Sequence, residues 1–172
     1  MKKQSITIWD ILFRYILISL LGIGNLVLFY TILTPATTYL IVFLLNFFDK
    51  TTIQGNLILF NSSVIKLIPA CVAGSAFYLL LILNLSTPNI KFNKRIKILI
   101  LSFLALFLLN VSRITILALV KDTIYFNLTH LFFWYVLSTI FVVGIWIASI
   151  KIFNIQNIPI YDDLMYILKL TK

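Results

Sequence analysis

Three residues of types that are rare in this sequence could together form a cysteine-nucleophile site. Cys71 is the only cysteine and His130 is the only histidine of the chain. Arg113 is the only charged residue deep within a predicted membrane helix. A thiol, a titratable base and a fixed cation near one another are the groups that nucleophilic attack by sulfur requires.

The three side chains would divide this chemistry between them. Cys71 is expected near the start of a long helix, whose positive dipole end would favour the thiolate. Because arginine stays protonated at working pH, Arg113 cannot be the base, and it suits stabilisation of an oxyanion. His130 is the candidate that takes the thiol proton and returns it to the leaving amine. Asn110 shares a helix face with Arg113, so it could orient the imidazole or position the arginine.

Each residue also has a purely structural explanation. Cys71 has small neighbours and could simply pack between helices. Arg113 is expected roughly 10 Å inside the end of its helix, where it costs at least ~2–3 kcal/mol unless it is paired, for instance with Asp49 or Asp122. His130 could be an ordinary interfacial residue. An enzyme requires the three to converge on one membrane face, whereas packing does not.

The composition indicates an integral membrane protein. Of the 172 residues, 62% are hydrophobic and only 11% are charged, which is too apolar for a soluble domain. No repeat or linker divides the chain, so we expect residues 1–172 to form a single membrane domain. One cysteine and one histidine are too few for a metal site, and no cofactor is expected.

Four apolar runs have about the length that crosses a bilayer. The predicted fold class is therefore an all-α membrane protein with four transmembrane helices. The predicted spans are residues 11–33, 70–87, 96–120 and 131–152.

Other segments are expected at the membrane surface. Tyr39–Phe48 is too short to span and predicts an interfacial or re-entrant segment. Leu57–Phe60 and Val64–Ile68 favour strands and predict a small extracytoplasmic hairpin. After Phe153, a proline, two acidic residues and spaced apolar residues predict an amphipathic C-terminal helix.

The basic residues predict the orientation of the chain. With both termini in the cytoplasm, inner segments hold ten lysines and arginines and outer segments hold three. Arg14 is expected to reach the inner headgroups by snorkelling. Cys71, Arg113 and His130 then share the extracytoplasmic face of a multi-pass protein of the cell membrane. Since the basic residues flank spans and form no surface stripe, no nucleic-acid partner is expected.

Three short strings carry a family resemblance. They are Ile68–Ser75 (IPACVAGS), Asn110–Ile114 (NVSRI) and His130 at the head of the next predicted helix. They resemble the Cys-small-small, Asn-x-x-Arg and His motifs of the exosortase/archaeosortase family of membrane cysteine transpeptidases, in the same order and membrane sidedness. The resemblance covers about residues 64–144. The chain is shorter than a typical member, so a short archaeal form without extra amino-terminal helices is the expected subfamily.

The resemblance implies a substrate class and a reaction. Members act on exported proteins whose C-terminal tag combines a short motif, a transmembrane helix and a basic cluster. The tag would be cleaved at the outer membrane face through an acyl-enzyme on Cys71. The protein would then pass to a membrane lipid or a similar nucleophile.

A non-catalytic membrane scaffold, or the substrate-binding subunit of a transporter, is the competing hypothesis. Four helices, small residues and one buried cation could bind an anion. No aspartate or glutamate lies within a predicted span, which argues against a proton-coupled relay.

Overall fold

The structure is a computed structural model that describes residues 8–23, 26–55, 57–61, 63–135 and 140–170. These residues form eight helices and one three-stranded sheet, so the predicted mainly helical fold is confirmed. In chain order the helices are α1 (Ile8–Gly22), α2 (Val27–Leu45), α3 (Pro69–Val72), α4 (Gly74–Leu85), α5 (Phe92–Val120), α6 (Phe126–Tyr135), α7 (Val142–Ile152) and α8 (Tyr161–Leu170).

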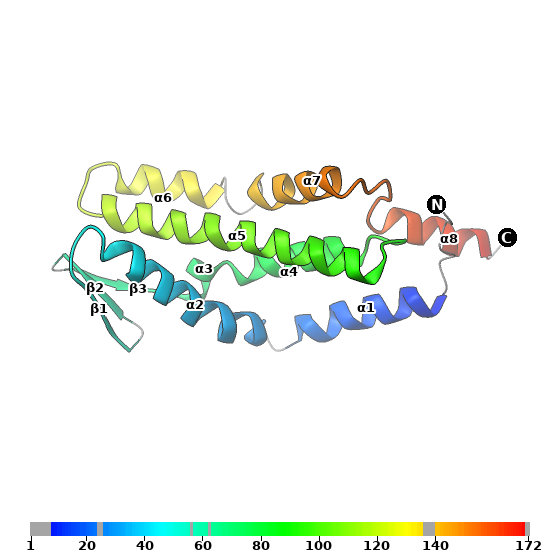
Figure 1. The fold of residues 1–172 in the computed structure, drawn as a ribbon, viewed down its shortest axis with the longest axis horizontal. Helices are drawn as coiled ribbons and strands as arrows, with labels where there is room; N and C mark the ends of the chain where they lie inside the picture. Colours follow the sequence, from blue (N-terminus) through cyan, green and yellow to red (C-terminus); the bar gives the residue numbers. More distant parts are fainter. Residues whose placement is uncertain (1–7, 24–25, 56, 62, 136–139, 171–172) are drawn as a thin grey trace.

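The helices form an elongated bundle whose legs alternate in direction (Figure 1). From the end at which both termini lie, α1 and α2 lead away, and α3 and α4 lead back. The long helix α5 then runs away again, and α6 and α7 return toward α8. Helix α5 is central, because it contacts α2, α3, α4, α6 and α7. We call the two ends the termini end and the sheet end.

The predicted span 11–33 is divided in the structure. Helix α1 ends at Gly22, and α2 begins after Leu26, whose φ of 60° is left-handed. Glycine favours an end here because it lowers helix propensity. It also permits close packing, since a Cβ at Gly22 would lie 2.4 Å from the hydroxyl oxygen of Tyr78. That hydroxyl donates a hydrogen bond of 2.8 Å to the carbonyl of Ile18.

The interfacial segment expected at Tyr39–Phe48 is wrong as a separate element. Helix α2 continues without interruption to Leu45, so most of this segment is the second half of a 19-residue helix. The hydropathy pattern misplaced the boundary because α2 begins only at Val27, which shifts the helix toward later residues.

The second predicted span also contains a break. Pro69 stands at the start of α3 as expected, but α3 has only four residues. Ala73, with φ of 59°, separates it from α4. Residues 96–120 lie within one continuous helix, as predicted. The last predicted span corresponds to α6 and α7, and residues 136–139 lie outside the described part of the chain.

Two helices in the described part of the chain, α2 and α5, are long and apolar enough to cross a membrane. Helices α4 and α7 are apolar but have only 12 and 11 residues. At 1.5 Å per residue these cover less than ~20 Å, which is short of ~30 Å of hydrocarbon. The prediction of four helices that each span the membrane alone is therefore not supported.

The predicted hairpin is confirmed and gains a strand. Strands β1 (Thr51–Gln54), β2 (Leu57–Phe60) and β3 (Ser63–Lys66) form an antiparallel sheet in this order. Alternate residues of β2, Ile58 and Phe60, are buried. The sheet therefore has one face on the helices, as the two-residue period of a strand requires.

One lysine and an apolar cluster attach the sheet to the helices. The Lys121 ammonium, just after α5, donates a hydrogen bond of 2.7 Å to the Phe60 carbonyl and lies 5.1 Å from the centre of the Phe60 ring. The buried members of the cluster come from α2, the sheet region and α5: Ile41, Leu45, Ile58, Phe60, Leu67, Val111, Ile114 and Ala118.

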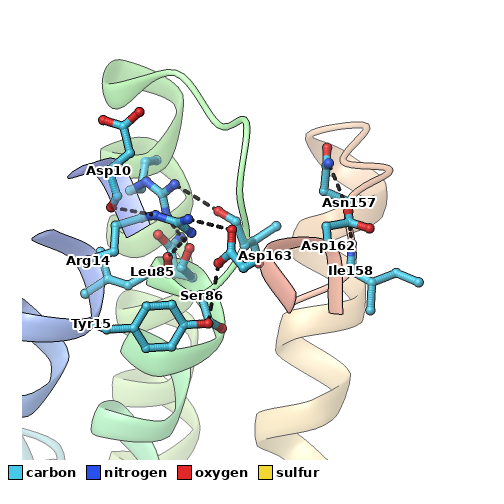
Figure 2. A network of polar contacts seen from close by, with 12 residues as sticks. Asp10, Arg14, Tyr15, Leu85, Ser86, Asn157, Ile158, Asp162 and Asp163 are labelled. Atoms are coloured by element: carbon cyan, nitrogen blue, oxygen red, sulfur yellow. Dashed lines mark hydrogen bonds and ion pairs between the residues drawn. The ribbon is translucent and has the colours of Figure 1, made fainter. Parts of the chain in front are cut away.

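At the termini end, a buried ion pair docks α8 (Figure 2). The Arg14 guanidinium donates to the Asp163 carboxylate at 2.7 Å and to the Leu85 carbonyl at 2.9 Å. The Tyr15 hydroxyl donates to the second Asp163 oxygen at 3.4 Å. Arg14 is only 8% exposed, so the expectation that it snorkels to headgroups is wrong. The predicted C-terminal helix is confirmed as α8.

Candidate functional site

Cys71 lies on a single helical turn with a fixed backbone. Ile68 before it is extended, and Pro69 begins the turn. The Cys71 amide donates a hydrogen bond of 2.8 Å to the Ile68 carbonyl. Ala73 then takes a left-handed conformation that non-glycine residues rarely adopt. Both sides of the turn are therefore constrained, and the thiol is half-buried.

The expected helix-dipole effect on Cys71 has no support in this geometry. The prediction required Cys71 to lie near the start of one long helix. Instead α3 is a four-residue turn, and Ala73 interrupts the backbone before α4. A single turn lacks the aligned peptide dipoles that sum to a useful charge.

Asn110 connects this turn to the central helix. Its side-chain amide donates a hydrogen bond of 2.9 Å to the Cys71 carbonyl. Asn110 is only 1% exposed, so the bond is shielded from competing solvent. The sequence suggested a role toward the histidine or the arginine, whereas the structure has Asn110 holding the backbone of Cys71.

Arg113 lies one turn further along α5 and is near enough to the Cys71 thiol for electrostatic interaction. Neither carboxylate suggested as its structural partner pairs with it. Asp122 lies 3.9 Å from the Lys121 ammonium, and Asp49 accepts from the Lys50 amide. Among the described residues, Arg113 therefore forms no ion pair.

Two polar atoms near the Cys71 turn have no hydrogen-bond partner among the described residues. They are Oδ1 of Asn110, an acceptor, and Nε of Arg113, a donor, and both are buried. Such groups are rare because each costs roughly 1–3 kcal/mol. One donor and one acceptor on α5 near the Cys71 turn are thus left unfilled inside the protein.

Two threonines with similar unfilled hydroxyls were missed in the sequence. Thr37 on α2 and Thr115 on α5 are buried, and within the described part of the chain their hydroxyl oxygens have no hydrogen-bond partner. Both helices contact α3. A hydroxyl within an otherwise apolar helix was the available signal.

His130 lies on α6, which packs on α5. Its ring stacks on Phe126, with centroids 5.9 Å apart and planes 14° apart. His130 lies about one helical turn from the start of α6, which follows α5 at the sheet end (Figure 1). The structure thus joins Cys71, Asn110 and Arg113 and has His130 on the adjoining helix. Proton transfer between His130 and the thiol stays a prediction.

The described residues contain no group of three His, Cys, Asp or Glu side chains that could hold a metal ion. The polar groups at the Cys71 turn are the thiol, the Asn110 amide and the Arg113 guanidinium, and the His130 imidazole lies on the adjoining helix. Compared with models of known protein families, with curated proteins and with solved structures, the sequence has no match.

Proposed function

We propose that this protein is a sortase-like membrane cysteine transpeptidase or protease. One observation carries the proposal: the bond from Asn110 to the Cys71 carbonyl fixes the thiol-bearing turn against α5, one helical turn from Arg113, which forms no ion pair with the described residues. A scaffold has no need for a half-buried arginine that has no carboxylate partner among the described residues and lies within electrostatic range of the single thiol. The ordered Cys, Asn-x-x-Arg and His motifs support the same function.

The reaction would proceed through a thioester. The Cys71 sulfur attacks the scissile carbonyl of the substrate while His130 accepts the thiol proton. Arg113 donates to the oxyanion of the tetrahedral intermediate through its guanidinium group. The intermediate collapses to the thioester as His130 protonates the leaving amine. A lipid nucleophile or water then attacks the thioester and frees the thiol.

The proposed substrates are exported proteins with a C-terminal tag of a motif, a transmembrane helix and a basic cluster. The sheet end of the bundle would face outward, and the termini end would face the cytoplasm. Three pairs of consecutive helices would each cross the membrane around α5: α1 with α2, α3 with α4, and α6 with α7. The excess of ten basic residues over three on the inner side supports this orientation.

Site-directed labelling tests the orientation. In a Cys71→Ala background, an impermeant thiol reagent added outside cells should label Ser63→Cys in β3 and leave Asn93→Cys at the start of α5 unlabelled. Permeabilised cells, in which both probes should react, are the control. The reverse pattern would reject the orientation and the proposed location of the site.

Cleavage of a tagged substrate tests the chemistry. Cys71→Ala should abolish processing because no nucleophile remains. Arg113→Lys should stay strongly impaired, because the lysine ammonium keeps the charge but cannot donate the paired, parallel hydrogen bonds of a guanidinium group. Ser112→Ala is the matched control: this hydroxyl neighbours Arg113 on α5 but is exposed and bonded to the Leu108 carbonyl. It should process normally.

The role of His130 has its own signature. His130→Ala removes the base, so residual activity should rise at alkaline pH as the thiolate forms unaided. Arg113→Lys should lack that alkaline recovery. Wild-type processing by folded Cys71→Ala protein would reject the enzyme and leave the scaffold hypothesis.

A further inference from the structure

A second polar site lies at the termini end, far along the bundle from Cys71. It is a pocket of about 290 Å³ between α1, the turn after α4 and the start of α5. Two arginines, Arg14 and Arg95, line it together with one carboxylate, Asp10. The thiol chemistry uses none of these residues.

The two arginines of the pocket differ in their hydrogen-bond partners. Arg14 is paired with Asp163. Arg95 donates through one amino group to the Asn84 carbonyl and through the other to the Thr87 carbonyl at 2.9 Å. Among the described residues Arg95 has no carboxylate partner. Because guanidinium carries five N–H groups, two carbonyl contacts leave donors for an anion.

Basic residues are frequent in the sequence where the pocket meets the beginning of α5. Lys91 and Lys94 come just before Arg95. Asp10 is the one carboxylate of the lining, and Asp163 is occupied by Arg14. Residues 91–95 thus carry three basic side chains, and Arg95 is the one of them that lines the pocket.

The remaining walls are apolar and partly open. Phe13 and Phe92 line the pocket and are 69% and 74% exposed. Leu17 and Ile90 complete this apolar side. On α1 the exposed apolar surface continues with Ile16 and Leu20. A ligand that fits must have an anionic group joined to a hydrocarbon chain.

We propose that this pocket binds an anionic phospholipid, with its phosphate on the Arg95 guanidinium and its proximal chain against Phe13 and Leu17. Arginine matches phosphate because its fork donates two parallel hydrogen bonds. Basic pockets between membrane helices commonly hold such headgroups. The inference is independent of the proposed enzymatic function.

A purely structural account of the arginines makes a different prediction. Arg14 and Arg95 donate to carbonyls of residues 84, 85 and 87 at the C-terminal end of α4, and helix ends need such donors. Capping alone would stabilise the protein without any preference among lipids. Lipid selectivity therefore separates the two accounts.

The test uses the full chain in a neutral detergent, titrated with phosphatidylglycerol or phosphatidylcholine and followed by native mass spectrometry. We expect one phosphatidylglycerol to bind about tenfold more tightly than phosphatidylcholine. Arg95→Gln should weaken phosphatidylglycerol binding by about tenfold. Lys97→Gln is the control, because it removes an exposed charge on the same helix outside the pocket.

A second variant keeps the test decisive if Arg95→Gln does not fold. Phe13→Ala alters an exposed wall and should weaken phosphatidylglycerol binding without changing thermal stability. Inorganic phosphate, added as a competitor to the phosphatidylglycerol complex, should displace the lipid only weakly. Equal binding of the two lipids, or unchanged binding in folded Arg95→Gln, would overturn the proposal. Binding of inorganic phosphate that depends on Arg95 but shows no lipid preference would overturn the lipid assignment.

Discussion

Replacing Asp163 by asparagine tests the buried ion pair that docks α8. The side chains of Arg14 and Asp163 are only 10% and 3% exposed, and their charged atoms lie 2.7 Å apart. Asparagine keeps the shape and can still accept from Tyr15, but it leaves the Arg14 charge buried without a counter-ion. Breaking a buried pair in this way costs about 3–5 kcal/mol.

Thermal unfolding of the purified protein in detergent gives the measurement. For a chain of this size each kcal/mol lowers Tm by about 2–4 °C, so Asp163→Asn should lower Tm by about 6–20 °C. Asp122→Asn is the matched control: its pair with Lys121 is 3.9 Å long, and the carboxylate side chain is 69% exposed. Loss of such an exposed pair costs about 1 kcal/mol or less.

A double variant separates the charge from the packing. Arg14→Met with Asp163→Leu removes both charges and fills similar space, so it should recover much of the stability lost in Asp163→Asn. If Asp163→Asn were no more costly than Asp122→Asn, the buried pair, and with it the docking of α8, would be refuted.

Two further comparisons test the packing of the helices. Gly74→Ala should destabilise the protein, because a Cβ there would lie 2.7 Å from the Tyr30 ring. Gly144→Ala on α7 is the control: its Cβ would meet nothing within 4 Å, and the helix should gain up to about 1 kcal/mol of stability. Equal Tm changes in the two variants would contradict the close contact between α2 and α4. Ser102 and Ser149 share a buried bond of 2.9 Å, and the Ser149 hydroxyl donates at 2.8 Å to a carbonyl of its own helix, so Ser102 must be the donor between them. Ser149→Ala leaves the Ser102 hydroxyl without an acceptor and should lower the free energy of unfolding by about 1–3 kcal/mol, against about 1 kcal/mol for Ser102→Ala. If thermal unfolding showed the opposite order, the assigned direction of the hydrogen bond would be reversed.

Helical content and the longest helix could be predicted from sequence because they depend on local hydropathy. Residues 96–120 contain neither glycine nor proline, and they form one helix as predicted. Hydropathy averaged over a window does not register backbone breaks. It therefore missed the left-handed residues Leu26 and Ala73, which divide two predicted spans.

Contacts between distant residues explain the other differences. Asp163 is 149 positions from Arg14, and no local pattern indicates that they meet. Arg14 alone resembles a snorkelling residue, so its burial could not be foreseen. At the candidate site, the three-residue spacing correctly gave Asn110 and Arg113 a common helix face. The bond from Asn110 to the Cys71 carbonyl required the packing of α3 on α5, which no spacing encodes.

Trapping an acyl-enzyme on Cys71 would test the proposed nucleophile directly. The protein would be mixed with a substrate carrying the C-terminal tag, quenched in acid, and examined by intact and peptide mass spectrometry. The account predicts a thioester adduct on Cys71 that hydroxylamine removes and that Cys71→Ala lacks. Substrate cleavage by Cys71→Ala, or cleavage by the wild-type protein with an adduct on another residue, would contradict it.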